Sequence, residues 1–177
     1  DNNPTMQSNS NLSFTYNNPI HSISSAEGYE EDVMGATMDA YLNGFEDPRR
    51  AVFFALSSNG NYRGLRNGHK NGDIFKGDEG LSKPNIQQGT PYIWMTAAEV
   101  FFLRAEGALK QWDMKGTPEA LYKSGIRASF EQHGVKNVEN YLVSTKVPAR
   151  YPGFKASPSA PAPSDITVVW NTNSTKN

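Results

Sequence analysis

The sequence contains no cysteine among its 177 residues. Disulfide bonds, thiolate metal sites, cysteine nucleophiles and lipid attachment to cysteine are therefore excluded within this stretch. Long apolar runs are absent too, since none approaches the roughly 20 residues that a bilayer-spanning helix needs. Neither sign of charge is in clear excess, because the chain has 17 basic and 18 acidic residues. Nucleic acids require a basic surface, so we exclude a nucleic-acid partner.

Apolar residues make up 37% of the chain, a low fraction for a compact domain of this length. The sequence opens on Asp1-Asn2-Asn3-Pro4 and ends without a closing element, so we expect a fragment of one larger domain. Its composition divides it into a loop-rich segment at 1–30, a helical core at 31–134 with an inserted loop at 57–93, and an irregular, proline-rich tail at 135–177.

Apolar side chains between residues 27 and 43 recur every three or four positions, the spacing of one helix face. Met34, Met38 and Leu42 follow this spacing, and Gly44 is placed to end the helix in a left-handed turn. The pattern predicts a helix over residues 27–43.

The next two stretches predict extended and irregular backbone. Residues 51–56 form an apolar run with one valine and two phenylalanines, which is short enough for a buried strand. Six glycines lie within residues 60–80, so we expect a long loop there. Long loops often carry function.

Residues 96–134 predict two consecutive helices. The first begins at Thr96, whose hydroxyl can accept from the amide of Glu99 while the Glu99 side chain reaches back, and it runs to about Trp112. The second begins at Thr117, which is followed by a proline suited to the first helical position. Gly134 is expected to end this second helix.

The connection between these helices is so short that they must turn back on each other as an antiparallel hairpin. Small residues set how closely the helices approach: Ala105, Gly107 and Ala108 on the first, and Ala120, Gly125 and Ala128 on the second. We expect Trp94 and Trp112 to anchor the hairpin. Its length of about 34 residues matches a tetratricopeptide repeat, a unit that needs neighbours to bury its faces.

Three stretches together resemble one known family. Residues 95–108 and 120–130 are similar to the paired helices of SusD-like (SusD/RagB) proteins. Residues 41–49 are similar to the family's helix followed by an Asp-Pro-Arg turn, and Tyr62-Arg63-Gly64 comes next in the same order. The resemblance covers residues 34–134 well. It implies a mainly α fold, in which tetratricopeptide-type helical hairpins carry long irregular loops and a few short strands.

The same resemblance implies a function. SusD-like proteins are surface-exposed lipoproteins of the outer membrane of Bacteroidetes, and they take part in nutrient uptake. They bind oligosaccharides or polysaccharides without catalysis and deliver them to a SusC-like, TonB-dependent transporter. The lipid anchor would lie outside this stretch.

Candidate ligand residues come from irregular segments, where binding side chains concentrate. Glycans are held by aromatic rings against their apolar C–H faces, while asparagine, aspartate and arginine bind the hydroxyls. On this basis we predict ligand-binding roles for Tyr16, Asn18, Tyr29 and Tyr62.

No metal or nucleotide site is predicted. His21, His69 and His133 are far apart and lack the short spacing of zinc ligands. The glycine-rich loop contains Gly68-His69-Lys70 but lacks the phosphate-binding sequence in which a lysine is followed by serine or threonine. We therefore expect no cofactor.

Two other functions stay open. The same hairpin without a sugar site would serve as a helical-repeat scaffold that binds protein. A glycoside hydrolase would need two opposed carboxylates, but Glu99 is explained by the helix cap and Glu106 by an ion pair or a solvated charge. Asp47, Arg49 and Arg50 could bind a sugar or a carboxylate, but we interpret Asp-Pro-Arg as a turn, in which Asp47 accepts from backbone amides.

Overall fold

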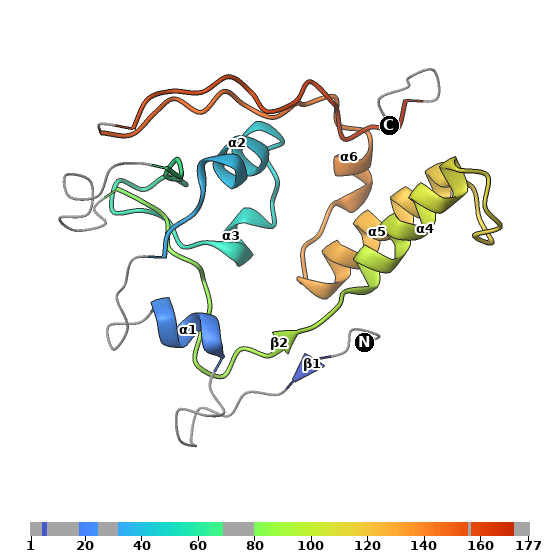
Figure 1. Cartoon of the computed structure of the whole chain (residues 1–177), viewed down its shortest axis with the longest axis horizontal. Coiled ribbons are helices and arrows are strands. Elements are labelled where there is room, and N and C mark those ends of the chain that lie inside the picture. Colours follow the sequence, from blue (N-terminus) through green and yellow to red (C-terminus); the bar gives the residue numbers. More distant parts are fainter. Residues whose placement is uncertain (1–4, 7–17, 25–31, 69–79, 156, 172–177) are drawn as a thin grey trace.

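The computed structural model describes residues 5–6, 18–24, 32–68, 80–155 and 157–171 (Figure 1). This part of the chain is mainly helical, as expected. Its helices are α1 Pro19–Ser24, α2 Ala36–Gly44, α3 Arg50–Phe53, α4 Ala97–Leu109, α5 Pro118–Gln132 and α6 Val138–Leu142. Two short strands, β1 Thr5–Met6 and β2 Tyr92–Ile93, pair antiparallel.

The predicted hairpin is confirmed, since α4 and α5 run side by side and antiparallel (Figure 1). The Thr96 hydroxyl accepts from the amide of Glu99 at 3.0 Å and so caps α4. Thr117 caps α5 in the same way, accepting from the amide of Ala120 at 3.2 Å. These local signals fix both starts.

Replacing Thr96 by alanine is expected to lower the free energy of unfolding by about 1 kcal/mol, because one amide of the first turn of α4 loses its acceptor. Urea denaturation measures the change. Thr145 is exposed and lies outside any helix or strand, so Thr145→Ala is the matched control. Equal losses in the two variants would contradict the capping role.

Small residues bring the two helices together at Gly125. A Cβ atom there would lie 2.7 Å from the Phe102 ring, so only glycine leaves room for the ring. Gly107 has a different role from the one predicted, because a Cβ there would meet Met114 and Trp112 of the connection rather than the facing helix.

The tryptophans do not anchor the hairpin, so this prediction was wrong. Trp94 is 70% exposed and Trp112 is 61% exposed. Trp94 packs edge-on against Tyr92, with ring centroids 5.8 Å apart. The hairpin core is formed instead by residues in helical positions, where the spacing sets the buried face.

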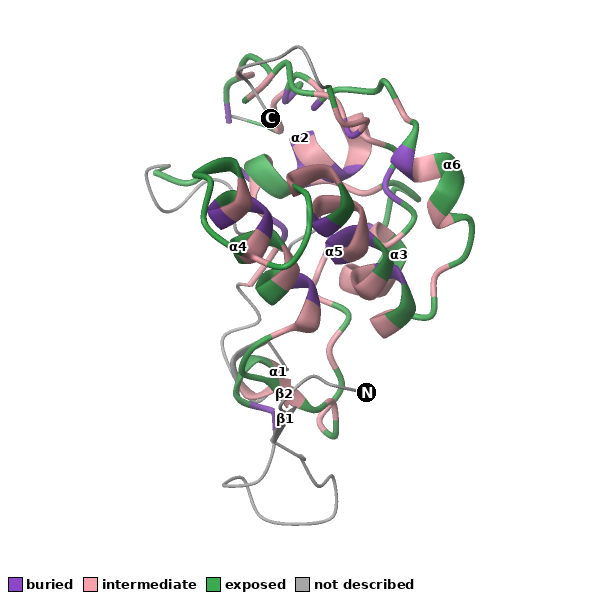
Figure 2. Ribbon diagram, turned by 90° about the vertical axis from the view of Figure 1, so that its right-hand side faces the viewer, coloured by how far each residue is buried: buried purple, intermediate pink, exposed green. Residues whose placement is uncertain are grey.

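The largest group of fully buried apolar side chains lies where α5 meets α6 and the end of the tail. Its members are Ile126, Phe130, Leu142 and Val168, and Phe45, Tyr122 and Tyr141 pack against it. Figure 2 shows the buried stretches of α5 in purple. A smaller cluster, of Leu65 and Leu81, lies beside Val33 and Phe154. The core is therefore built from segments far apart in the sequence.

Two predicted elements differ from the structure. Helix α2 begins at Ala36, because Gly35 has extended backbone at φ −74° and ψ 151°. Residues 32–35 are not helical, and residues 25–31 lie outside the described part. The run at 51–56 was predicted as a strand, but α3 occupies Arg50–Phe53 and only Phe54 forms an isolated bridge, with Pro84. A short apolar run fits either structure, and here the turn at Asp47 starts a helix.

The tail runs out along α2 and returns towards α5 (Figure 1). Tyr151 and Ala160 form an antiparallel bridge where it doubles back. On its way out, the Ala149 amide donates to the Ala40 carbonyl at 2.8 Å, and after its return the Tyr122 hydroxyl donates to the Val168 carbonyl at 2.7 Å. The tail thus contacts α2 on its way out and α5 after its return.

Gly44 is required for this arrangement, but not as a left-handed helix end. The positive φ of 49° belongs to Glu46 instead. A Cβ atom on Gly44 would lie 2.1 Å from the Ala149 nitrogen and 2.6 Å from Pro148 backbone atoms. The absence of a side chain lets the tail lie directly on α2.

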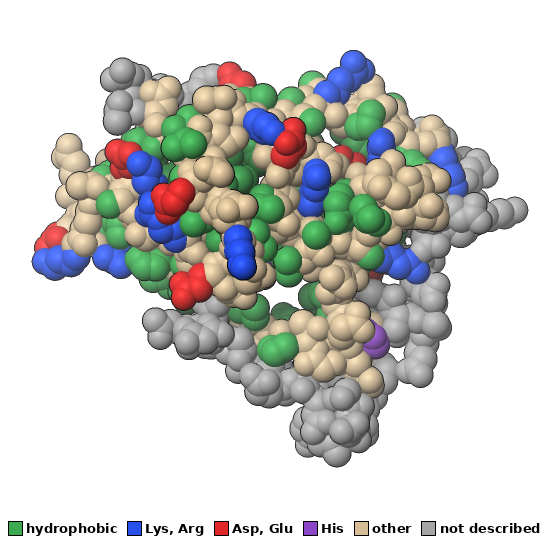
Figure 3. All heavy atoms as spheres, turned by 180° about the vertical axis from the view of Figure 1, so that it is seen from behind, with side chains coloured by type: hydrophobic (Ala, Val, Ile, Leu, Met, Phe, Trp, Pro, Cys, Tyr) green, Lys and Arg blue, Asp and Glu red, His purple; other side chains and the backbone are tan. Residues whose placement is uncertain are grey.

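Charged side chains of both signs share the surface. Glu106 pairs with Lys110 at 2.6 Å on exposed α4, which agrees with its interpretation as a structural ion pair. Arg127 of α5 pairs with Glu139 at 2.7 Å. On the face opposite to that of Figure 1, acidic and basic side chains lie next to one another among apolar ones (Figure 3).

Candidate functional site

The Asp-Pro-Arg turn holds a buried ion pair. Asp47 is 2% exposed, and its Oδ1 accepts from the amide and from Nε of Arg49, each at 2.9 Å. Its Oδ2 accepts from Arg49 Nη2 at 2.5 Å and from the Tyr141 hydroxyl at 2.8 Å. Arg49 also donates to Ser129 at 2.8 Å and lies over the Phe130 ring at 4.9 Å.

Burial alone would raise the pKa of Asp47, but the hydrogen bonds and charge of Arg49 outweigh it and hold the pKa below its usual value. Burial raises the pKa of the Tyr141 hydroxyl, and the charge of Asp47 raises it further. Both carboxylate oxygens are thus occupied inside the protein. The turn is a structural element that joins α3 to α5 and α6, as interpreted from the sequence.

A polar hollow of about 550 Å³ opens beside this turn, and we call it the Tyr62 hollow. Three parts of the chain form it: α2 with the start of α3, the loop that follows α3, and the first half of the tail. Its lining residues are Asp39, Asn43, Arg50, Leu56, Gly60, Asn61, Tyr62, Arg63, Ala149, Arg150 and Pro152.

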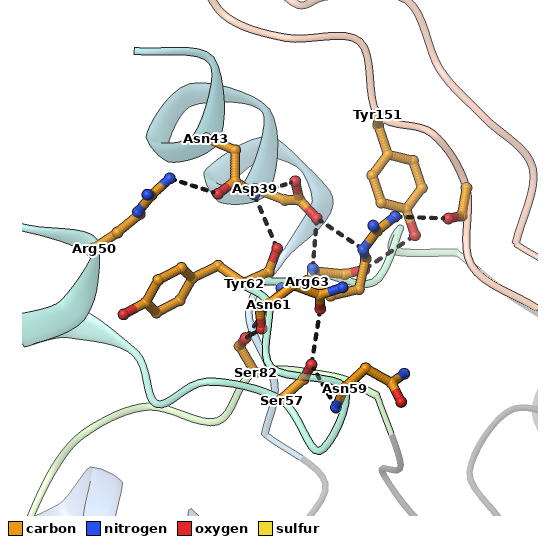
Figure 4. Close-up of polar contacts among 12 residues, drawn as sticks. Asp39, Asn43, Arg50, Ser57, Asn59, Asn61, Tyr62, Arg63, Ser82 and Tyr151 are labelled. Carbon is orange, nitrogen blue, oxygen red and sulfur yellow. Dashed lines mark hydrogen bonds and ion pairs between the residues drawn. The ribbon is translucent and has the colours of Figure 1, made fainter. Parts of the chain in front are cut away.

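Asp39 fixes the floor of the hollow (Figure 4). This carboxylate is 4% exposed; its Oδ1 accepts from Asn43 Nδ2 at 2.8 Å, and its Oδ2 accepts from the Gly64 amide at 2.7 Å. Arg63 Nε lies 3.9 Å from Oδ2. The Gly64 carbonyl accepts from the buried Tyr151 hydroxyl at 3.0 Å, which ties the tail to the same point. The buried carboxylate therefore positions the loop rather than facing solvent.

Tyr62 is held between α2 and α3. Its carbonyl accepts from Asn43 Nδ2 at 2.9 Å, and the Arg50 guanidinium lies over its ring at 5.1 Å. Arg50 Nη1 in turn donates to Asn43 Oδ1 at 3.2 Å (Figure 4). The half-buried aromatic ring and the charged group next to it are thus fixed in place before any ligand arrives.

A tight turn presents Asn61 at the rim. The Ser57 amide donates to the Asn61 carbonyl at 2.8 Å, and Ser57 Oγ donates to Asn61 Oδ1, also at 2.8 Å. Gly60 has φ +73°, a conformation that favours glycine. The Asn61 side chain is therefore oriented, and no residue that the structure describes accepts from its amide nitrogen, which is a donor at the edge of the hollow.

A comparison with family models matches residues 1–177 to the family described as SusD-like, Susd and RagB outer membrane lipoprotein. The chain belongs to the SusD-like family. The resemblance inferred from residues 34–134 is thereby confirmed, and it extends over the whole sequence.

Solved SusD-like structures agree with the match. A SusD homolog from Bacteroides thetaiotaomicron is 35% identical, and the match covers 88% of this chain with a TM-score of 0.78. A chitin-binding SusD homolog from Flavobacterium johnsoniae is 36% identical over 90% of this chain, with a TM-score of 0.81. A homolog from Bacteroides uniformis is 34% identical over 97%, also with a TM-score of 0.81.

This SusD-like chain spans about a third of the length of those proteins, since the matches cover 34%, 34% and 36% of them. A search among proteins with curated descriptions finds no match. No helix in the described ranges is long and apolar enough to cross a membrane. Within the same ranges no cluster of three histidine or acidic side chains is placed to hold a metal ion.

The predicted ligand residues of this SusD-like protein fall in different places. Tyr62 lies in the hollow that carries its name. Tyr16 and Tyr29 lie outside the described residues. Asn18 is 2% exposed, away from the hollow; its Oδ1 accepts from the Ile20 amide at 3.0 Å, and its Nδ2 donates to the Thr90 carbonyl at 2.9 Å. These contacts fix the start of α1.

Asn18 also lines a second, more apolar groove of about 740 Å³ between α1, α3 and β2. Phe53, Phe54, Tyr92 and His133 line the same groove. Burial lowers the pKa of His133, and the charge of Arg49 lowers it further. The ligand role of Asn18 stays a prediction.

Asn61, Arg50 and Arg150 of the SusD-like hollow were not among the predicted ligand residues. Asn61 lies one position before Tyr62, in the glycine-rich loop that the sequence marked as functional. No sequence pattern indicated Arg150 as a ligand residue, because Arg150 reaches the hollow when the tail packs against α2. Proximity created by long-range folding is not visible in residue spacing.

Proposed function

We propose that this chain is part of a surface-exposed protein of the outer membrane that binds an oligosaccharide or polysaccharide without cleaving it. The protein would then pass the glycan to a SusC-like, TonB-dependent transporter. The Tyr62 hollow is the observation that carries the proposal, since it combines a fixed aromatic ring with oriented amide and guanidinium donors. A chitin-binding SusD homolog of similar fold supports it.

The chemistry of the hollow suits a sugar. An aromatic ring offers an apolar face to sugar C–H groups, while the donors bind hydroxyls. Because Tyr62, Asn43 and Asn61 are held by hydrogen bonds within the chain, little side-chain freedom is lost on binding. Rigid presentation of this kind lowers the entropic cost of binding in an open, hydrated site.

Capture without cleavage fits the charges present. Glycoside hydrolysis needs two carboxyl groups on opposite sides of the bond to be cut. Asp39 is the one acidic residue among the described residues that line the hollow, and its two oxygens accept from Asn43 and Gly64. A single buried carboxylate with both oxygens bonded cannot act as a pair of acid and base.

Replacing Tyr62 by alanine is expected to weaken glycan binding roughly tenfold, because the sugar loses the ring against which it packs. Affinity gel electrophoresis against chitin derivatives, xylan, mannan and pectin measures the change. Trp112→Ala is the matched control, since Trp112 is equally aromatic and 61% exposed but lies in the α4–α5 connection. Equal loss in both variants would contradict a site at Tyr62, and retention of no glycan by the unaltered protein would overturn the proposal.

A helical-repeat scaffold that binds protein is the second candidate. Apolar side chains on the hairpin favour it, since Val100 and Leu103, three positions apart on one face of α4, are 41% and 57% exposed. Such a face suits contact with another helical unit. The glycan panel separates the two functions, because a scaffold would retain none of the polysaccharides.

A further inference from the structure

We infer that the Tyr62 hollow selects a glycan that carries anionic groups, carboxylate or sulfate ester, over a neutral one. The inference rests on the proposed function and adds the class of glycan. It follows from which charged groups surround the hollow and from what occupies their hydrogen-bonding atoms.

Three guanidinium groups line the hollow, each from a different part of the chain. Arg50 comes from α3, Arg63 from the loop beside Tyr62, and Arg150 from the tail. Asp39 is the acidic residue among the described lining residues, and it is buried with both oxygens bonded. The hollow is therefore net positive, although the chain as a whole has 17 basic and 18 acidic residues.

Among the residues that the structure describes, Asp39 offsets the charge of Arg63, whose Nε lies 3.9 Å from its Oδ2, and no acidic side chain forms an ion pair with Arg50 or Arg150. Glu46 interacts electrostatically with Arg50, but its carboxylate pairs with Lys146, whose hydrogen bond and charge lower the pKa of Glu46. Elsewhere on the surface, basic side chains lie beside acidic ones, as in the pairs of α4 and α5. Arg50 and Arg150, which have no ion-pair partner among the described residues, are a local departure from that pattern.

Much of the hydrogen-bonding capacity of these arginines remains for a ligand. Towards the residues that the structure describes, Arg50 donates to Asn43 Oδ1, Arg63 to the Gly153 carbonyl at 3.2 Å, and Arg150 to Ser159 Oγ at 2.7 Å. A guanidinium has five N–H donors, so each of the three groups keeps donors in excess of these bonds. Planar pairs of donors match the two oxygens of a carboxylate or a sulfate.

The positive charge lies next to the ring that would hold the sugar. Arg50 stands over the Tyr62 ring at 5.1 Å, and its bond to Asn43 fixes that position. A sugar packed at this ring would bring an acidic substituent close to a guanidinium that is already oriented. A neutral sugar would gain the ring contact and hydrogen bonds to its hydroxyls, but no charge pairing.

Matched pairs of polymers test the inference: polygalacturonate against its methyl ester, and dextran sulfate against dextran. Isothermal titration calorimetry of the protein is expected to give about tenfold tighter binding to the charged member of at least one pair. The first pair reports carboxylate recognition and the second reports sulfate recognition. Added salt is expected to reduce the preference, because the arginines are partly or fully exposed.

Arg50→Gln and Arg150→Gln are expected to weaken binding to the charged member more than binding to the neutral member, and so to remove most of that preference. Arg150 is exposed, so its variant keeps the test valid should Arg50→Gln fail to fold. Arg127→Gln is the matched control, because this exposed arginine of α5 does not line the hollow. Equal loss in Arg127→Gln would show nonspecific attraction of a polyanion and overturn the inference.

The remaining outcomes separate the inference from the proposed function. Equal affinity for the charged and neutral members of both pairs would overturn the anionic preference and leave glycan capture standing. Binding of none of these polymers, nor of any in the wider panel, would overturn both.

Discussion

Replacing Asp47 by alanine is expected to lower the free energy of unfolding by about 3–5 kcal/mol. Asp47 is 2% exposed and holds Arg49 through three hydrogen bonds, so its loss leaves a largely buried guanidinium without a counter-charge. The Tyr141 hydroxyl loses its acceptor at the same time. Domains of ordinary stability have about 5–15 kcal/mol in total, so urea denaturation should find this variant partly or wholly unfolded.

The exposed pair of Arg127 and Glu139 provides the control for this variant. It also joins an arginine to a carboxylate through two bonds, at 2.7 Å and 2.9 Å. Its side chains are 46% and 68% exposed, so water replaces the interaction when one partner is removed. Glu139→Ala should therefore leave the free energy of unfolding nearly unchanged. A similar loss in both variants would show that burial does not govern the effect.

The contribution of Asp47 should also depend on pH. Its pKa in the folded protein lies below the unfolded value of about 3.9, so its stabilising effect is fully present above that value. The effect is lost as the pH falls through the folded-state pKa. The difference in unfolding free energy between the unaltered protein and Asp47→Asn should thus be constant near neutral pH and shrink below about pH 4. A difference that grows on acidification would contradict the ion pair.

Replacing Gly44 by alanine is expected to lower the free energy of unfolding by about 3 kcal/mol. The new Cβ would lie 2.1 Å from the Ala149 nitrogen, and backbone atoms cannot rotate away as a flexible side chain can. The tail must then move off α2, and the Ala149 amide loses its bond to the Ala40 carbonyl. Urea denaturation gives the stability, and amide hydrogen exchange at Ala149 reports the displacement directly.

Gly35→Ala is the matched control for the Gly44 variant. A Cβ on Gly35 meets no atom within 4 Å, and its φ of −74° is accessible to alanine. This variant should keep the stability unchanged or raise it slightly, because alanine reduces the freedom of the unfolded chain. Comparable destabilisation in both variants would mean that the tail does not need the bare surface at Gly44.

Local signals in the sequence predicted the hairpin well. The caps at Thr96 and Thr117 depend on residues three positions apart, so short stretches determine where both helices begin. The prediction of a strand at 51–56 was wrong because its sequence lacks such a local signal. The length and apolarity of this run fit a strand or a helix. The turn at Asp47 favours the helix, because the Asp47 carbonyl accepts from the Arg50 amide at 3.2 Å.

The candidate site could be predicted only in part, because it is assembled from residues far apart in the sequence. Tyr62 was identified from its place in an irregular loop, but its neighbours in space come from α2, α3 and the tail. Gly44 was singled out for the wrong reason, since a helix end is visible in the sequence and an approaching tail is not. Asp47 was correctly interpreted as an acceptor of a backbone amide, while its bond to Tyr141, 94 residues away, gave no signal.

The path of the tail has a consequence for how the chain folds as it leaves the ribosome. Helix α2 meets the tail through Ala40 and Ala149, so on the order of 100 residues must be synthesised between the two partners, which takes about 5–20 s at usual rates. During that interval the surface of α2 around Gly44 is uncovered. Nascent α2 and α3 should therefore recruit chaperones until residues 145–160 emerge, and translation speed should affect the yield of folded protein.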